Sequence, residues 1–259
     1  MGYRCFEVDR VGAVATVRLS RPDELNTMTP QFWRELPDVV GSVGRDGGVR
    51  AVVLASTGRH FCAGMDLSEV SAGTVDQISD AQERLFTMGF RAEKPIVAAV
   101  EGASLGGWMG LVGNCHIVVA HPEATFGLTE IRVGLWPFLV HRALSAAIGE
   151  RRVLELALTG RVFGTQEAKE MGLVQEVAGS PRTRAAEIAS AVSEFSPDTL
   201  RSGLRFTREV RGQDWETAGQ TARRMRDEVF ASGDFQEGLR AFREKRHPQW
   251  PSVHRPYQL

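Results

Sequence analysis

The sequence PIVAAVEGASLGGWMGLVG, residues 95–113, decides how the chain folds. Ile96–Val100 is an uninterrupted apolar run that a Glu-Gly pair ends abruptly. A run of that length, closed by turn residues, predicts a strand buried in a core. The paired glycines Gly106 and Gly107 then lead into a segment of small residues. They predict a strand-to-helix junction whose backbone N–H groups can approach a ligand closely.

Strands and helices alternate on both sides of this stretch. Two alternating segments near the N-terminus predict a β-hairpin, and Ala51–Ala55 and Ile117–Ala120 predict further buried strands. From Pro181 onward the pattern is helical throughout. Strands alternating with helices, followed by helices alone, predict an α/β core with a helical C-terminal extension. We expect a core domain at residues 1–195 and a helical region at residues 196–259.

Weaker patterns lead to several local expectations. Residues 68–80 are polar and poorly periodic, which predicts a loop or an irregular helix. Gln82–Arg91 and Arg142–Ile148 each predict a helix. Thr29-Pro30 predicts the N-cap and first residue of another helix, and Pro37 lies inside that helix and should kink it. Ser196-Pro197 predicts the start of a later helix in the same way. A short loop is expected after the Glu101-Gly102 pair, and Ala124–Phe126 predicts a short strand.

The composition is that of an ordinary globular protein. With 259 residues, 42% of them hydrophobic and 24% charged, the chain can bury a substantial core. A net charge of −1 creates no field that attracts nucleic acid. The cysteines and histidines show no metal-binding or disulfide spacing, and no signal-peptide or membrane-spanning pattern is present. We therefore expect a cytoplasmic protein without a metal, a membrane or a nucleic-acid partner.

The glycine turn allows an interpretation as a serine hydrolase. Residues 102–106, GASLG, match GxSxG, the nucleophile elbow, between a strand and a helix. Ser104 would be the nucleophile and a late histidine, His247 or His254, its base. No HGGG-type segment precedes the motif, and too few strands follow it to build a hydrolase sheet. This interpretation is therefore the weaker one.

A second interpretation joins two glycine turns. The segment 62–66, CAGMD, follows the strand that ends at Ala55, and the Gly106-Gly107 pair follows the strand that ends at Val100. One backbone N–H group from each turn could converge on one oxygen and form an oxyanion hole. With a thioester carbonyl bound there, the hole favours the enolate and acidifies the α-carbon. For either cluster alone, tight strand–helix packing is an alternative explanation.

Six segments, in order and at matching spacings, resemble the enoyl-CoA hydratase/isomerase (crotonase) family. They are RPDELNTMTPQFWREL, HFCAGMDL, KPIVAAVEGASLGG, ATFGLTEIRVGL, LTGRVFGTQEAKEMGLVQEV and SGDFQEGLRAFREKRHPQW. The resemblance covers nearly the whole chain. It implies an α/β fold, the ClpP-like ββα superhelix of crotonases, followed by helices that build a homotrimer or a dimer of trimers. It also implies an acyl-CoA substrate and no separate cofactor.

The resemblance assigns roles to individual residues. The oxyanion hole would be formed by the backbone N–H groups of Met65 and Gly107. The residues that would contact CoA are Ala63, Asp66 and Leu67, largely through backbone groups, and Phe242 and Lys245, which match positions that reach a neighbouring subunit.

The acid–base residues distinguish between reactions. Hydration of a 2-enoyl thioester needs two acid–base groups, and hydratases of this family use two glutamates. The first of these positions is Gly110 here, which has no side chain, and the second is Glu130. A lone glutamate can move a proton from the α-carbon of a 3-enoyl thioester to its γ-carbon. The site pattern therefore resembles the Δ3,Δ2-enoyl-CoA isomerase branch.

Bulky residues favour the same reaction. We expect Trp108, Trp136 and Phe138 to exclude water from the site, which hinders hydration and protects a dienolate, and Trp136 to contact the substrate. Apolar neighbours should raise the pKa of Glu130 by desolvation. Two alternatives remain open. One is a hydratase whose second acid comes from elsewhere, and the other is a catalytically silent CoA-binding subunit.

Overall fold

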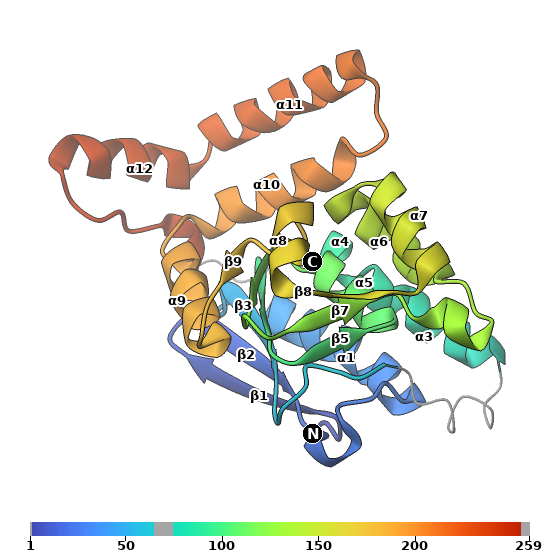
Figure 1. The fold of residues 1–259 in the computed structure, drawn as a ribbon. Helices are drawn as coiled ribbons and strands as arrows, with labels where there is room; N and C mark the ends of the chain where they lie inside the picture. The colour runs from blue at the N-terminus through green and yellow to red at the C-terminus, as the bar shows by residue number, and fades with distance from the viewer. Residues whose placement is uncertain (1, 65–74, 255–259) are drawn as a thin grey trace.

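The structure is a computed structural model that describes residues 2–64 and 75–254 (Figure 1). The roles predicted for Met65, Asp66 and Leu67 therefore lie outside the described residues. The strands are β1 (Phe6–Val11), β2 (Val14–Leu19), β3 (Ala51–Ser56), β4 (Ile96–Val100), β5 (Ala103–Leu105), β6 (Ile117–Ala120), β7 (Thr125–Gly127), β8 (Val162–Gly164) and β9 (Glu176–Val177).

Helices connect and follow these strands. The α-helices are α1 (Pro30–Arg45), α3 (Val75–Phe86), α4 (Met88–Arg91), α5 (Gly107–Asn114), α6 (Phe138–Ile148), α7 (Glu150–Thr159), α8 (Thr165–Met171), α9 (Pro181–Ser193), α10 (Pro197–Glu209), α11 (Trp215–Phe230) and α12 (Gly233–Glu244). Short 3₁₀ helices are η1 (Pro22–Glu24), η2 (Glu130–Val133) and η3 (Pro251–His254). The order of strands, then helices alone, confirms the predicted α/β class with a helical C-terminal region.

The main sheet has the strand order β1-β2-β3-β4-β6-β9. β1 and β2 form the predicted antiparallel hairpin, and each later strand runs parallel to its neighbour. Val52 and Leu54 of β3 belong to the larger core cluster, which includes α1 and α5, whereas Val53 belongs to a smaller one that includes α9. Since helices cover both faces, β3 and β4 are apolar at nearly every position.

A second sheet, in the order β5-β7-β8, was not predicted as a sheet. The sequence indicated a loop where β5 lies and a short strand near β7, but it gave no sign of β8. Three-residue strands are too short to show a periodicity of two. Their pairing matters for function, because the register β5–β7 sets Leu105 opposite Gly127. That register brings the segment before Gly106 beside the segment that leads to Glu130.

Two predicted helix boundaries are wrong. α3 begins at Val75 rather than at Gln82, and a break at Thr87 separates it from α4. α6 begins at Phe138, because Pro137 supplies the backbone turn before its first residue. α1 continues through Pro37 to Arg45, with Thr29 as its confirmed N-cap.

The C-terminal helices extend beyond the sheets, with α11 and α12 forming an arm above α10 (Figure 1). Ser196 caps α10 through its hydroxyl, which accepts from Thr199 N, as the sequence predicts. The hydroxyl also donates to the buried Asp234 of α12, which accepts a second hydroxyl from Ser252. Hydrogen bonds from Ser196 and Ser252 to Asp234 therefore attach α12 to the start of α10 and to η3. Trp215 and Phe242, further along the arm, are exposed.

Two glycine substitutions test how the α4–α5 contact is packed. A Cβ at Gly89 would lie 1.7 Å from Asn114 O, whereas a Cβ at Gly203 on α10 would meet no atom within 4 Å. We expect Gly89→Ala to lower the free energy of unfolding by about 1–3 kcal/mol or more, because backbone atoms must move. Gly203→Ala should raise it by about 0.5–1 kcal/mol. Urea unfolding measures both, and equal effects of the two changes would contradict this packing.

Candidate active site

Glu130 lies beside the glycine turn that opens α5. A Cβ added to Gly106 would lie 3.5 Å from Oε1 of Glu130. Two connections create this proximity: β5 pairs with β7, and Gly106 N donates to Gly127 O at 2.8 Å. β7 ends at Gly127 and η2 begins at Glu130, so the Glu130 carboxylate lies close to the glycine turn at Gly106.

The two predicted glycine turns are neighbours, as expected. Cys62 forms an isolated parallel bridge with Ser104, and its N–H donates to Ala103 O at 3.0 Å. A Cβ on Gly64 would lie 3.9 Å from Leu105 O. Gly107 is the first residue of α5, where a helix offers N–H groups that have no acceptor within the helix. An oxygen near Gly107 would thus meet a donor at a helix N-terminus.

The turn at Gly64 is held from its other side by the segment before α1. Ala63 N donates to Leu25 O, and Met28 N donates to Gly64 O at 3.0 Å. Leu25 and Asn26 both have positive φ angles, and the buried Asn26 side chain donates to the carbonyls of Thr57 and His60. Ala63, a predicted CoA contact, is therefore fixed close to the second glycine turn.

The carboxylate of Glu130 is poorly solvated. Glu130 Oε2 is enclosed and has no hydrogen-bond partner within the described residues. Burial raises the pKa of Glu130 above its ordinary value, although the residue's own N–H partly opposes this. A carboxylate kept away from water and ion pairs is a stronger base than an exposed one. The desolvation predicted from the neighbouring sequence is therefore present.

Position 110 has no room for a side chain. A Cβ on Gly110 would lie 2.4 Å from Val140 Cγ1 and 3.2 Å from Phe86 Cδ1. Both neighbours are buried, so they cannot easily move aside. By family resemblance, this is the position at which hydratases carry their first glutamate. The packing adds that α6 and α3 fill the space that such a carboxylate would need.

The expectation that three bulky residues exclude water from the site is wrong for two of them. Trp108 is fully buried in the core, where its ring meets Phe32 and Phe61 edge to face. Phe138 is 73% exposed at the start of α6. Trp136 is partly buried against the main core, close in sequence to Glu130. Trp108 is the second residue of α5, and its side chain lies on the side of that helix that faces the core. Its place directly after a glycine pair did not indicate this direction.

Ser104 cannot act as an exposed nucleophile. It lies within β5, it is fully buried, and its hydroxyl has no hydrogen-bond partner in the described part of the chain. A nucleophile elbow instead presents its serine above the sheet. Residues 102–106 therefore form a short strand followed by a turn, and the hydrolase interpretation is wrong.

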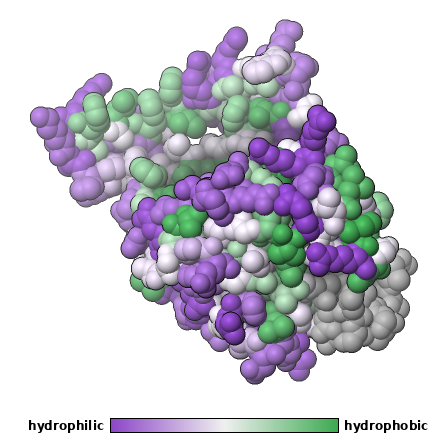
Figure 2. Space-filling model, in the orientation of Figure 1, coloured by the Kyte–Doolittle hydropathy of each residue, from purple (hydrophilic) through white to green (hydrophobic). Residues whose placement is uncertain are grey.

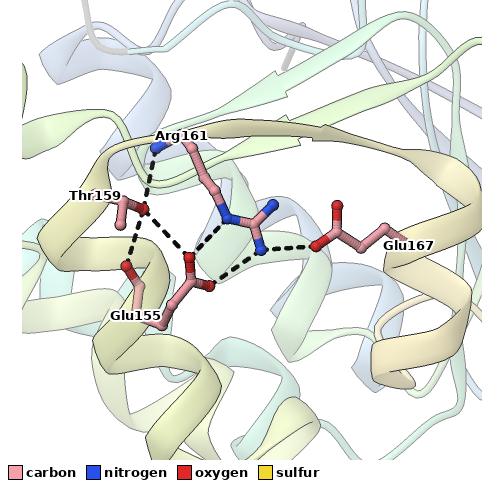
Figure 3. Close-up of polar contacts among 4 residues, drawn as sticks. All are labelled: Glu155, Thr159, Arg161 and Glu167. Atoms are coloured by element: carbon pink, nitrogen blue, oxygen red, sulfur yellow. Dashed lines mark hydrogen bonds and ion pairs between the residues drawn. The ribbon is translucent and has the colours of Figure 1, made fainter.

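Figure 3 shows a cluster of charged side chains that links α7 to α8, and α7 also contacts η2, which begins at Glu130. Arg161 donates to Glu155 Oε1 at 2.7 Å and to Glu167 Oε1 at 2.6 Å, which links α7 to α8. The adjacent Gly160 contacts η2, because a Cβ there would lie 2.7 Å from Ile131 Cγ2. These contacts fix the turn against which the first residues after Glu130 pack.

The last two predicted contacts lie far from this site. Phe242 is 83% exposed on α12, and Lys245 ends that helix in a left-handed conformation. α12 packs on α11 and η3, across the molecule from α5 and α7 (Figure 1). A single chain does not bring these two residues to Glu130.

The sequence interpretation missed the residues that surround the glycine turn from α3 and from the segment before α1. Met28 Cε and Phe86 Cζ would lie 2.7 and 3.1 Å from a Cβ on Gly107.

Within residues 2–64 and 75–254, no three His, Cys, Asp or Glu side chains gather as a metal site. None of the helices in these ranges has the length and apolar character needed to cross a bilayer.

Comparison with known proteins agrees with this geometry. The family model described as enoyl-CoA hydratase/isomerase matches residues 9–253. A putative enoyl-CoA hydratase of Thermus thermophilus is 36% identical, and the match covers 92% of this chain and 98% of that protein. A mevalonyl-coenzyme A hydratase of Aspergillus fumigatus is 33% identical, with coverages of 92% and 91%.

Solved structures have the same fold. The enoyl-CoA hydratase of Mycobacterium smegmatis superposes with a TM-score of 0.89 at 28% identity, covering 95% of this chain and 98% of that one. The enoyl-CoA hydratase of Shewanella pealeana gives 0.91 at 26% identity, covering 96% of each chain. Together with the family match and the paired glycine turns beside a buried glutamate, these likenesses show that the chain belongs to the enoyl-CoA hydratase/isomerase family and has the crotonase fold.

Proposed function

We propose that this enzyme converts 3-enoyl-CoA to 2-enoyl-CoA, with Glu130 as the single proton carrier. One observation carries the proposal. A desolvated carboxylate lies beside the Gly106-Gly107 turn, while packing fills the position where a second acid would stand. Isomerisation needs one group that takes a proton and returns it, whereas hydration also needs a group that positions and activates water.

The reaction proceeds in two proton transfers. The thioester oxygen accepts hydrogen bonds from the N–H groups of Gly107 and, by family resemblance, Met65. Glu130 removes a proton from the α-carbon, and the electron pair moves to the thioester oxygen to give a dienolate. Glu130 then returns the proton to the γ-carbon, so the double bond moves into conjugation with the carbonyl. No cofactor is consumed.

Hydration is the competing proposal. The relatives carry the name enoyl-CoA hydratase, and one is named for mevalonyl-coenzyme A. This chain could follow them if a water molecule or a residue outside the described ranges supplied the second acid–base group. The filled space at Gly110 favours isomerisation over that route.

We also propose that the site is completed by other copies of the chain. Phe242 and Lys245 would reach the CoA of a neighbour, and residues 196–259 would pack in a homotrimer or a dimer of trimers. Exposed apolar side chains along the arm and on α7 support an assembly, and Figure 2 shows hydrophobic residues in both regions. They include Trp215, Phe230 and Phe242 on the arm and Leu154 and Leu158 on α7.

Replacing Glu130 tests the chemistry directly. We expect Glu130→Gln to lower kcat for 3-enoyl-CoA isomerisation by about 10²–10⁴-fold, because the amide cannot accept the α-proton. Ser104→Ala is the control and should keep nearly full activity. Parallel assays of 2-enoyl-CoA hydration decide between the proposals. Wild-type hydration as fast as isomerisation would sink the isomerase proposal, and CoA binding without either activity would indicate a silent subunit.

The burial of Glu130 should also appear in stability. A carboxyl group whose pKa is raised by folding favours the folded state only while it is protonated, so its contribution is lost as pH rises through the folded pKa. We expect Glu130→Gln to be more stable than wild type at pH 7, with the difference vanishing below about pH 4, near the pKa of an unfolded glutamate. Denaturant unfolding across this range measures it. The exposed Glu123→Gln is the control, and an equal gain there would contradict the explanation.

Restoring space at position 110 should change the reaction. Gly110→Glu alone should destabilise the fold, because its Cβ would overlap Val140. Gly110→Glu with Val140→Gly removes the overlap with Val140, leaves only the 3.2 Å approach to Phe86, and supplies a second carboxylate. We expect the ratio of hydration to isomerisation to rise at least about tenfold in the double variant. Val140→Gly alone is the control, and the same rise in it would show that the new carboxylate is not responsible.

A further inference from the structure

A cavity lies between α10 and the body of the protein, apart from the candidate active site. Its volume is about 490 Å³, within the range of small-molecule sites. α4, the end of α5 and β6 form one side, α6 and residues 172–175 form another, and α10 closes it from above. Glu130, Gly106 and Gly107 are not among its lining residues. Phe86 lines the cavity and also contacts the Gly107 and Gly110 positions, so it separates the two sites.

The charges around this cavity all have one sign. Arg142 from α6 and Arg208 and Arg211 from the α10 end line it, and no acidic residue does. None of the three guanidinium groups forms an ion pair within the described residues, although Arg211 lies over the Phe90 ring at 5.3 Å. Elsewhere on α10, Arg205 pairs with Glu209 and Glu228. The cavity thus collects cations that lack counter-ions in a chain with a net charge of −1.

The other polar groups of the cavity have partners already. His116 Nδ1 accepts from Ile96 N, and burial lowers the pKa of His116 to about 4, so the ring is neutral. Thr207 donates to Gly203 O, and Gln175 uses its amide on Val118 N and Gly172 O. The guanidinium groups are therefore the donors that remain for a ligand.

The remaining lining is mainly aliphatic. Its side chains include Val112, Leu139, Ala143, Ala146, Ala147, Leu173 and Leu204. Inorganic phosphate would satisfy the arginines but leave this surface uncovered. An aliphatic chain would cover it, while a carboxylate at its end could take paired N–H donors from one guanidinium.

We propose that this cavity binds an aliphatic carboxylate, with the chain between α6 and α10 and the carboxylate at Arg208 and Arg211. The carboxylate accepts N–H donors from two of the three unpaired cations and neutralises one positive charge. The site is independent of the reaction at Glu130, because it shares with that site only the Phe86 wall.

Calorimetric titration of the full-length protein with dodecanoate tests the proposal. We expect saturable binding that Arg208→Gln with Arg211→Gln weakens at least tenfold. Arg151→Gln with Arg223→Gln removes the same charge from exposed positions outside the cavity and should leave binding unchanged. Dodecan-1-ol, which lacks the charge, and inorganic phosphate, which lacks the chain, should each bind at least tenfold more weakly than dodecanoate.

Four results would overturn the proposal. The first is an absence of dodecanoate binding to the wild type, and the second is unchanged affinity in the Arg208/Arg211 variant. The third is displacement of dodecanoate by excess coenzyme A, which would place it at the Glu130 site. The fourth is equal binding of phosphate, which would reduce the cavity to an anion site.

Discussion

The pairing of β5 with β7 is the constraint on which the site depends. The strand register places Leu105 opposite Gly127. The hydrogen bond from Gly106 N to Gly127 O continues the pairing one residue beyond β5. Without that pairing, nothing in the sequence would hold the glycine turn at Gly106 close to Glu130. Two three-residue strands contribute little stability by themselves. They are held by β8, which pairs with β7, and by Phe126, which packs in the core cluster that includes α5.

Packing, as much as chemistry, sets what the site can do. Val140 and Phe86 meet the α-carbon side of Gly110 so closely that no larger residue fits. A glycine that lacks a carboxylate could record recent loss of an acid, with a gap left behind. Here the gap is closed, and interiors tolerate neither voids nor overlaps well. The packing leaves no space for a side chain at position 110, which supports the proposed reaction through one carboxylate.

The unpaired Glu130 carboxylate conflicts with the rule that buried polar groups find partners. Other charged side chains do find partners, even at the surface. Arg161, Arg184 and Arg246 each bind two carboxylates near the surface. Glu130 Oε2 has no partner in the described residues, so folding is opposed by its desolvation. Such a cost is typical of groups retained for catalysis, because a partner that stabilised the carboxylate would weaken it as a base.

The sequence alone determined the α/β class, most strands of the main sheet, the helix caps at Thr29 and Ser196, and Glu130 as the candidate base. These depend on local patterns: apolar runs, capping residues and ordered motifs. Tertiary structure decided that Trp108 points into the core, that Ser104 is buried, that Val140 fills the space at Gly110, and that Arg142 and Arg211 share a cavity. These features join residues distant in the chain, and one sequence does not state which side chains meet across the gap between two helices.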